Sequence, residues 1–298
     1  MRALSFVTLV AVTTACAVPK PAAREPEPAA HAGCDTPAAE APASANGTAA
    51  PASAVNAPSA VAAESTLPPA ALVVGEASPN PATPPTLAIT SPARGAHVEA
   101  DASVSLDVRG WPTAEGAAHV HLILDNQPYK PIYDTGAPVP LRDLNGGKPL
   151  TPGPHVLVAF ASRANHESVK LSGALAVSGF VVGAEPATFH APSGFLVYSR
   201  PKGTYAGPQA NHVLVDFQLV GTTLAEGKQS VALEVRSESL AEPLRARTPR
   251  FGAPFYLENL RSGSYTLELS LVDEAGRVVD GAWNKTTRTI VIDRTKKP

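Results

Sequence analysis

Residues 119–129 read His-Val-His-Leu-Ile-Leu-Asp-Asn-Gln-Pro-Tyr, an alternating apolar run that ends in a turn. Successive side chains of a β-strand point to opposite faces, so the run predicts a strand with two different faces. We expect a core face of Val120, Leu122 and Leu124 and an outer face of His119, His121 and Ile123. The two histidines therefore share one side of one strand.

The same pattern recurs about 110 residues later, and the repeat extends to neighbouring strands. The paired segments are 104–110 with 215–221, 120–124 with 231–235, 138–141 with 254–257, and 155–159 with 265–269. Short alternating runs between turn residues, without helical periodicity, predict antiparallel sandwiches. We expect two domains, at 86–183 and 193–293, with a short hinge near 185–192.

Two motifs carry a resemblance to a known fold. They are the turn Ser91-Pro92-x-x-Gly95 and the segment Leu260-x-x-Gly263-x-Tyr265-x-Leu267. Both halves resemble bacterial immunoglobulin-like domains of the fibronectin/pre-albumin type. The resemblance implies an all-β chain of two tandem antiparallel immunoglobulin-like β-sandwiches. Because such sandwiches carry unrelated activities, it implies almost nothing about function.

The N-terminal part has a different composition. Residues 1–16 combine a positive charge, a short apolar core and the sequence Thr-Thr-Ala-Cys, which resembles a bacterial lipobox ending at Cys16. We expect a signal peptide and a lipid anchor on Cys16 at the outer membrane; ordinary cleavage would instead leave a secreted or periplasmic protein. Residues 17–85 are rich in Ala and Pro and are predicted to be a disordered linker, including the apolar island at 72–74.

Composition argues against several classes of function. The net charge is −2 and no basic stripe is present, which argues against a nucleic-acid partner. No nucleophile elbow, zinc-protease helix, phosphate loop or dinucleotide fingerprint occurs, so we expect no enzyme. The two cysteines, Cys16 and Cys34, both precede the expected domains, so we expect no disulfide within them.

The outer face of the first domain is unusual. If residues 119–124 pair with residues 155–161, that face consists of His119, His121, Ile123, Val156, Val158 and Phe160. The matching face of the second domain is polar, so something is expected to cover the first: a partner, the other domain or the loop 126–137. The leading hypothesis is a non-catalytic envelope module that binds or scaffolds an envelope protein or polysaccharide through this face.

A metal site is the second hypothesis. The loop after residues 155–161 carries His166 and Glu167, at the end of the sandwich where the strand 119–124 begins. A His-x-His pair with a further His and Glu supplies ligands suited to zinc or copper. A hydrogen-bonded structural cluster of the same residues remains the alternative.

Part of the first domain also resembles an uncharacterised exported bacterial domain. The shared features are a His-x-His-Leu strand, an Asp-Asn-x-Pro-Tyr turn and a His-Glu-Ser loop. The resemblance implies one functional unit of His119, His121, Asp125, Tyr129, Tyr133, Arg163, His166 and Glu167. A third hypothesis, carbohydrate binding, rests on Trp111, Tyr129 and Tyr133 as stacking surfaces, while His155 is expected at a corner or in the core.

Overall fold

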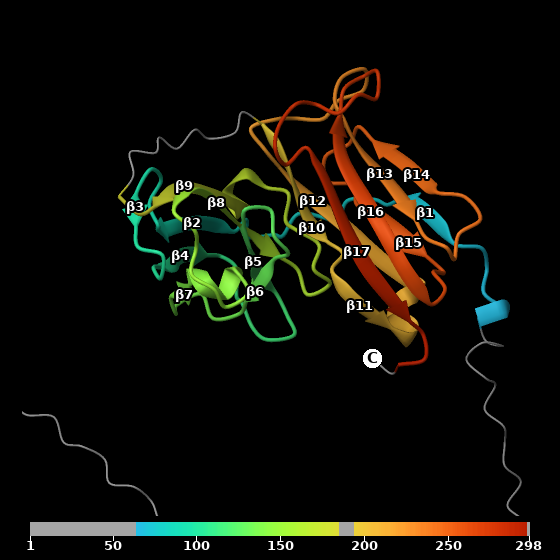
Figure 1. Cartoon of the computed structure of the whole chain (residues 1–298), viewed down its shortest axis with the longest axis horizontal. Helices are drawn as coiled ribbons and strands as arrows, with labels where there is room; N and C mark the ends of the chain where they lie inside the picture. The colour runs from blue at the N-terminus through green and yellow to red at the C-terminus, as the bar shows by residue number, and fades with distance from the viewer. Residues whose placement is uncertain (1–63, 185–193, 297–298) are drawn as a thin grey trace, which may run out of the picture. The chain divides into compact units, whose positions relative to one another are not determined.

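The computed structural model describes residues 64–184 and 194–296, and the regular secondary structure of these ranges is mainly β-strand (Figure 1). The predicted signal segment, Cys16, Cys34 and the hinge near 185–192 lie outside the described residues. Within those ranges, no helix has the length and apolar character needed to cross a bilayer.

The first sandwich has a three-stranded and a five-stranded sheet. The smaller has the order β2 (Thr86–Ser91), β4 (Ser103–Arg109) and β7 (Val139–Pro140). The larger has the order β3 (His97–Val98), β9 (Leu175–Val182), β8 (Gly153–Ser162), β5 (His119–Leu124) and β6 (Lys130–Ile132). Two 3₁₀ turns, η1 (Leu141–Leu144) and η2 (Ser172–Ala174), complete this half.

The second sandwich has a four-stranded and a five-stranded sheet. The first has the order β1 (Ala71–Val74), β15 (Phe255–Glu258), β12 (His212–Val220) and β10 (Phe195–Arg200). The other has the order β11 (Gly203–Ala206), β17 (Lys285–Asp293), β16 (Gly263–Val272), β13 (Ser230–Arg236) and β14 (Leu244–Thr248). A 3₁₀ turn, η3 (Gly207–Asn211), follows β11.

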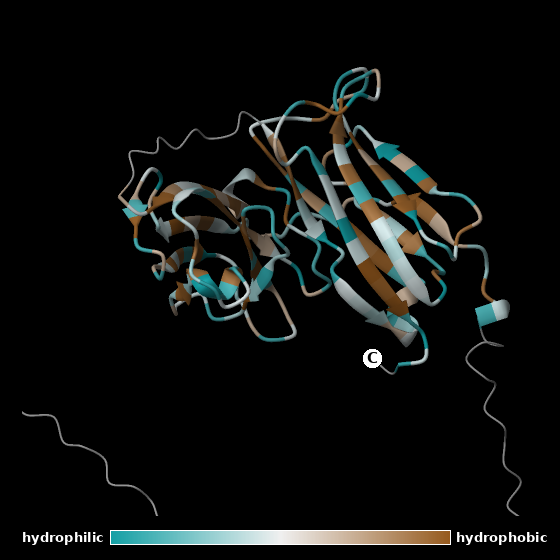
Figure 2. Ribbon diagram, viewed as in Figure 1, coloured by the Kyte–Doolittle hydropathy of each residue, from teal (hydrophilic) through white to brown (hydrophobic). Residues whose placement is uncertain are grey.

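Apart from β1, the two sandwiches have the same strand order, which confirms the predicted repeat and fold class. The expected pairing of β5 with β8 is also confirmed, with His119 opposite Ser162 and Leu124 opposite Leu157. Each half has its own apolar core, and Figure 2 shows the hydrophobic residues concentrated along the strands. The core-facing residues of β5 are those expected from its alternation.

Strand β1 corrects the C-terminal end of the predicted disordered linker at 17–85, of which residues 17–63 lie outside the described residues. Residues 71–74 pair antiparallel with β15 of the second sandwich, although they precede the first sandwich in sequence. Leu72 and Val74 pack against the second core, whereas Val73 faces outward and is 40% exposed. The Ala/Pro composition concealed this strand, because four residues gain their stability from the exposed edge of β15 rather than from their own apolar content.

We predict that Leu72→Asp lowers the free energy of unfolding by about 1–2 kcal/mol, because it removes partly buried apolar surface. Val73→Asp introduces the same side chain on the same strand but toward solvent. We expect it to lower the free energy of unfolding much less. Urea unfolding of both variants measures the difference. Equal losses would show that β1 does not pack on the second core.

The second sandwich covers the outer face of the β5–β8 sheet. The prediction that a partner docks on this face is therefore wrong. Ile123, Val158 and Phe160 have no exposed surface and form one cluster with Phe195, Val197 and Trp283. The face is apolar, as predicted, but residues of the second sandwich of the same chain cover it. A partner cannot reach these side chains while the two sandwiches are docked.

Strand β10 lies between the two sandwiches and is buried on both faces. Leu196 and Tyr198 belong to the second core, while Phe195 and Val197 contact the first sandwich. A strand buried on both faces carries a continuous apolar run rather than an alternating one. The sequence Phe-Leu-Val-Tyr at residues 195–198 has that property.

His155 occupies the corner position expected for it. Tyr265, at the equivalent place in the second repeat, donates its hydroxyl to the carbonyl of Arg261, four residues earlier (2.9 Å). His155 makes the same link through Nε2 to the Thr151 carbonyl (2.8 Å). Its Nδ1 lies 2.6 Å from an Asp125 carboxylate oxygen, and this bond raises the pKa of His155. Two acceptors therefore favour the doubly protonated ring.

This corner predicts a pH effect with a definite sign. A pKa raised on folding adds stability below the unfolded value near 6.5, and that stability is lost as the pH rises through the folded pKa. His155→Gln keeps a donor but cannot titrate. The stability difference between wild type and this variant should therefore shrink between pH 6 and pH 9 in denaturant titrations. A pH-independent difference would contradict the ionised corner.

Candidate functional site

Three histidines meet at one end of the first sandwich. His119 and His121 project from β5 on the face opposite the core, as expected, and His166 comes from the loop after β8. His119 and His121 are buried, and His166 is half-buried. Among the described residues, these are the three metal-ligating side chains that converge, with ligand atoms within 4.8 Å of one another.

The ring nitrogens form a small triangle. His119 Nε2 lies 3.0 Å from His121 Nε2 and 3.0 Å from His166 Nδ1. His121 Nε2 lies 3.3 Å from His166 Nδ1. The Ser162 hydroxyl is a further 3.1 Å from His121 Nε2, and the Tyr129 hydroxyl is 3.4 Å from His166 Nδ1.

These contacts exceed what the rings can use as hydrogen bonds. A ring nitrogen carries either one proton or one lone pair, so it makes one good in-plane bond. His121 Nε2 nevertheless has three polar neighbours within 3.3 Å. A cation between the three nitrogens would accept all their lone pairs at once.

The outward nitrogens of the β5 histidines have partners that orient the rings. His119 Nδ1 donates to the Ala117 carbonyl at 2.8 Å, which leaves the Nε2 lone pair directed into the triangle. His121 Nδ1 lies 3.0 Å from the hydroxyl of Ser199, on β10 of the second sandwich. The Tyr129 ring stacks on His121 with centroids 3.6 Å apart. Such second partners are typical of metal-binding histidines.

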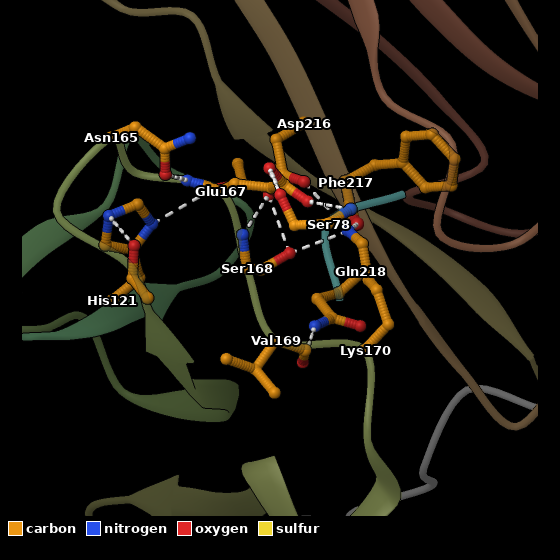
Figure 3. Close-up of polar contacts among 12 residues, drawn as sticks. Ser78, His121, Asn165, Glu167, Ser168, Val169, Lys170, Asp216, Phe217 and Gln218 are labelled. Carbon is orange, nitrogen blue, oxygen red and sulfur yellow. Dashed lines mark hydrogen bonds and ion pairs between the residues drawn. The ribbon is translucent and has the colours of Figure 1, made fainter. Parts of the chain in front are cut away.

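The loop that carries His166 is held by the second sandwich (Figure 3). Ser168 donates from its backbone N–H and its hydroxyl to buried Asp216 of β12, at 3.3 and 2.7 Å. Lys170 donates to the other Asp216 oxygen at 2.8 Å, and Gln218 donates to the Val169 carbonyl at 2.9 Å. The position of His166 therefore depends on the second sandwich.

His166 itself adopts a strained backbone. Its φ is +68°, in the left-handed region that L-residues rarely occupy. A turn maintains this conformation, with the His166 N–H donating to the Arg163 carbonyl at 2.9 Å. Strain of this kind, about 1–2 kcal/mol for a non-glycine residue, is found preferentially at functional sites.

The cluster is electrically neutral near pH 7. Burial lowers the pKa of His119 and, more strongly, that of His121. Burial and the nearby Arg200 lower the pKa of His166 to about 3. Neutral imidazole is the form that coordinates metal, so these side chains need not lose a proton to become ligands.

The other predicted site residues lie around the triangle or away from it. Glu167 is buried but turned away, where its carboxylate accepts from the N–H and hydroxyl of Ser78 at 3.1 and 2.6 Å. Asp125 contacts His155, and Arg163 donates to the Pro79 carbonyl at 2.5 Å. The Tyr133 ring lies 5.1 Å from that of His119.

The aromatic residues do not form an open sugar platform. Trp111 donates its indole N–H to the His119 carbonyl at 3.1 Å, and Tyr129 is 2% exposed. Both rings are used to build the histidine cluster. Tyr129 therefore offers no stacking surface to a sugar ring, whereas Trp111 and Tyr133 are partly exposed, and carbohydrate binding stays a prediction.

Four neighbours of the cluster were not predicted from the sequence. Ser162 ends β8, and Ser199, Arg200 and Lys202 lie at the β10–β11 turn of the second sandwich. Lys202 donates to the Tyr129 carbonyl at 2.6 Å, and burial with nearby arginines lowers its pKa to about 8. In the sequence, Arg200 and Lys202 stand out because they closely follow an apolar run. No pattern around these four residues indicates that they lie beside the histidines.

Comparisons with known proteins give a limited result. No protein-family model matches the chain, and no curated protein matches it. Fibronectin(III)-like modules of Clostridium thermocellum CbhA are 13% identical, with 72% of this chain and 98% of that chain covered and a TM-score of 0.25. The chicken CNTN1 FN1–FN3 domains are 11% identical, with 71% and 66% covered and a TM-score of 0.22.

The alpha chain of the chicken interferon gamma receptor is similar to the same degree. It is 11% identical, with 70% of this chain and 98% of that chain covered and a TM-score of 0.24. TM-scores in this range carry no argument about this chain. The fold of this chain is established by the order of the strands in its own sheets.

Proposed function

We propose that this chain is a non-catalytic binding protein for a divalent transition metal, zinc or copper, held by His119, His121 and His166. The observation that carries the proposal is the triangle of ring nitrogens with sides of 3.0, 3.0 and 3.3 Å. In a tetrahedral site with bonds of about 2.0–2.1 Å, ligand atoms lie about 3.3 Å apart. The triangle is therefore close to the size of such a site before any ion enters.

The ligand type supports zinc or copper over calcium or magnesium. Imidazole nitrogen suits zinc and copper, whereas calcium and magnesium take oxygen ligands. Glu167 was expected as a fourth ligand, but its carboxylate is engaged by Ser78. The proposed protein ligand set is therefore three histidines, with one coordination position left for another donor.

We predict that the full chain carrying Cys16→Ser and Cys34→Ser, which removes competing thiols, binds one Zn²⁺ or Cu²⁺ and gains thermal stability from it. His119→Ala or His166→Ala should weaken binding more than about 100-fold. Ser199→Ala removes only an outer partner, and about 10–100-fold is expected. Isothermal titration calorimetry and melting curves measure both effects.

Two variants control this experiment. His97→Ala removes an exposed histidine on β3, which β9 and β8 separate from β5 in the sheet, and Glu167→Gln removes the carboxylate that the geometry excludes; both should bind metal like wild type. If neither ion binds to the wild type, or if His97→Ala weakens binding as much as His119→Ala, the cluster is a hydrogen-bonded structural element instead.

We further propose that the protein acts in the bacterial cell envelope, attached to the outer membrane through Cys16. The lipobox-like residues before Cys16 support this location. Wild-type chain expressed in a Gram-negative host should partition into the detergent phase and incorporate labelled fatty acid. Cys16→Ser should do neither, while Cys34→Ser should behave as wild type. A labelled Cys16→Ser chain would contradict the anchor.

A further inference from the structure

A divalent metal ion bound by the three histidines would leave the site with an excess of positive charge. No carboxylate or thiolate of the described residues joins the three histidines. The side chains outside the cluster whose charges lower the pKa of both His121 and His166 are cationic, Arg200 and Lys202, and Arg200 lines the same cavity as His166. A divalent ion would thus add two positive charges to a partly buried site that already has two. Buried charge without a counter-charge is strongly unfavourable.

Arg200 has unused hydrogen-bonding capacity at this place. Its Nη1 donates to the Tyr205 hydroxyl at 2.8 Å, but its buried Nε has no partner. A guanidinium presents its donors as a fork that fits two oxygens of a carboxylate or another oxyanion. A buried donor without a protein partner is available to an acceptor group of a bound ligand.

A cavity reaches the cluster from this side. It has a volume of about 510 Å³, and its lining includes His166, Arg200 and Tyr205. Arg200 is the one permanently charged side chain in this lining, and no acidic side chain contributes to it. A small ligand fits such a volume, and the lining favours one with negative charge.

We infer that the metal site binds a small carboxylate or other oxyanion as the fourth ligand, held by Arg200, which lines this cavity together with His166. This inference rests on the proposed metal site. One oxygen of the anion would coordinate the metal, and Arg200 would contact the anion from the other side. The anion supplies the negative charge that the protein ligands lack.

The experiment uses the full chain with Cys16→Ser and Cys34→Ser, loaded with Co²⁺ as a coloured substitute for zinc. Acetate and inorganic phosphate are titrated separately while the visible spectrum, which reports the coordination of cobalt, is recorded. Both anions should change the spectrum saturably, and the tighter of the two identifies the better class of oxyanion.

Arg200→Gln should weaken anion binding at least about tenfold, the loss typical of a charge-assisted hydrogen bond. The same variant should still bind Co²⁺. Arg200→Lys keeps the charge but not the fork and should lie between wild type and Arg200→Gln, which keeps the test valid if the glutamine variant folds poorly. Arg109→Gln alters an exposed arginine remote from the cavity and should match wild type.

The outcomes separate the two proposals. If Co²⁺ binds but neither anion changes the spectrum, the fourth ligand is water or a protein hydroxyl, that of Ser162 or Tyr129, and the anion inference is wrong while the metal site stands. If Arg200→Gln and wild type bind anions equally, the role of Arg200 is wrong. If Co²⁺ does not bind, both proposals fail.

Discussion

The rest of the structure depends on one constraint, the burial of strand β10 on both of its faces. It contributes Leu196 and Tyr198 to the second core and Phe195 and Val197 to the cluster that covers the first sandwich. One strand therefore fills two apolar interfaces with alternate side chains. Because both faces are buried, the two sandwiches cannot separate without exposing Phe195, Ile123 and Phe160 to water.

The histidine cluster depends on the same docking. β5 places His119 and His121, but the hydroxyl beside His121 belongs to Ser199 of β10. The loop that presents His166 is anchored by Asp216 of the second sandwich. Arg288 of β17 donates to the carbonyls of Asn126 and Gln127, which fixes the turn leading to Tyr129. The first sandwich thus supplies all three histidines, and the second supplies the partners that orient them.

Much of the fold and part of the site could be predicted from the sequence. Alternation assigned the two faces of β5, and the repeat matched the strands of one half with those of the other. The convergence of His166 with His119 and His121 followed from the pairing of β5 with β8. Glu167 could not be placed, because adjacent loop residues point to different sides, and its partner, Ser78, is 89 residues away in sequence. β1 was missed because its stability comes from the edge of β15.

The sequence by itself determined the period-two pattern, the repeat and the two-histidine face of one strand, since these depend on side-chain alternation along a local segment. Only the tertiary structure decided what covers that face and what surrounds the histidines. Ser199, Arg200 and Asp216 reach the cluster through the packing of one sandwich on the other. That packing depends on the shape of two complete surfaces, which no local pattern encodes.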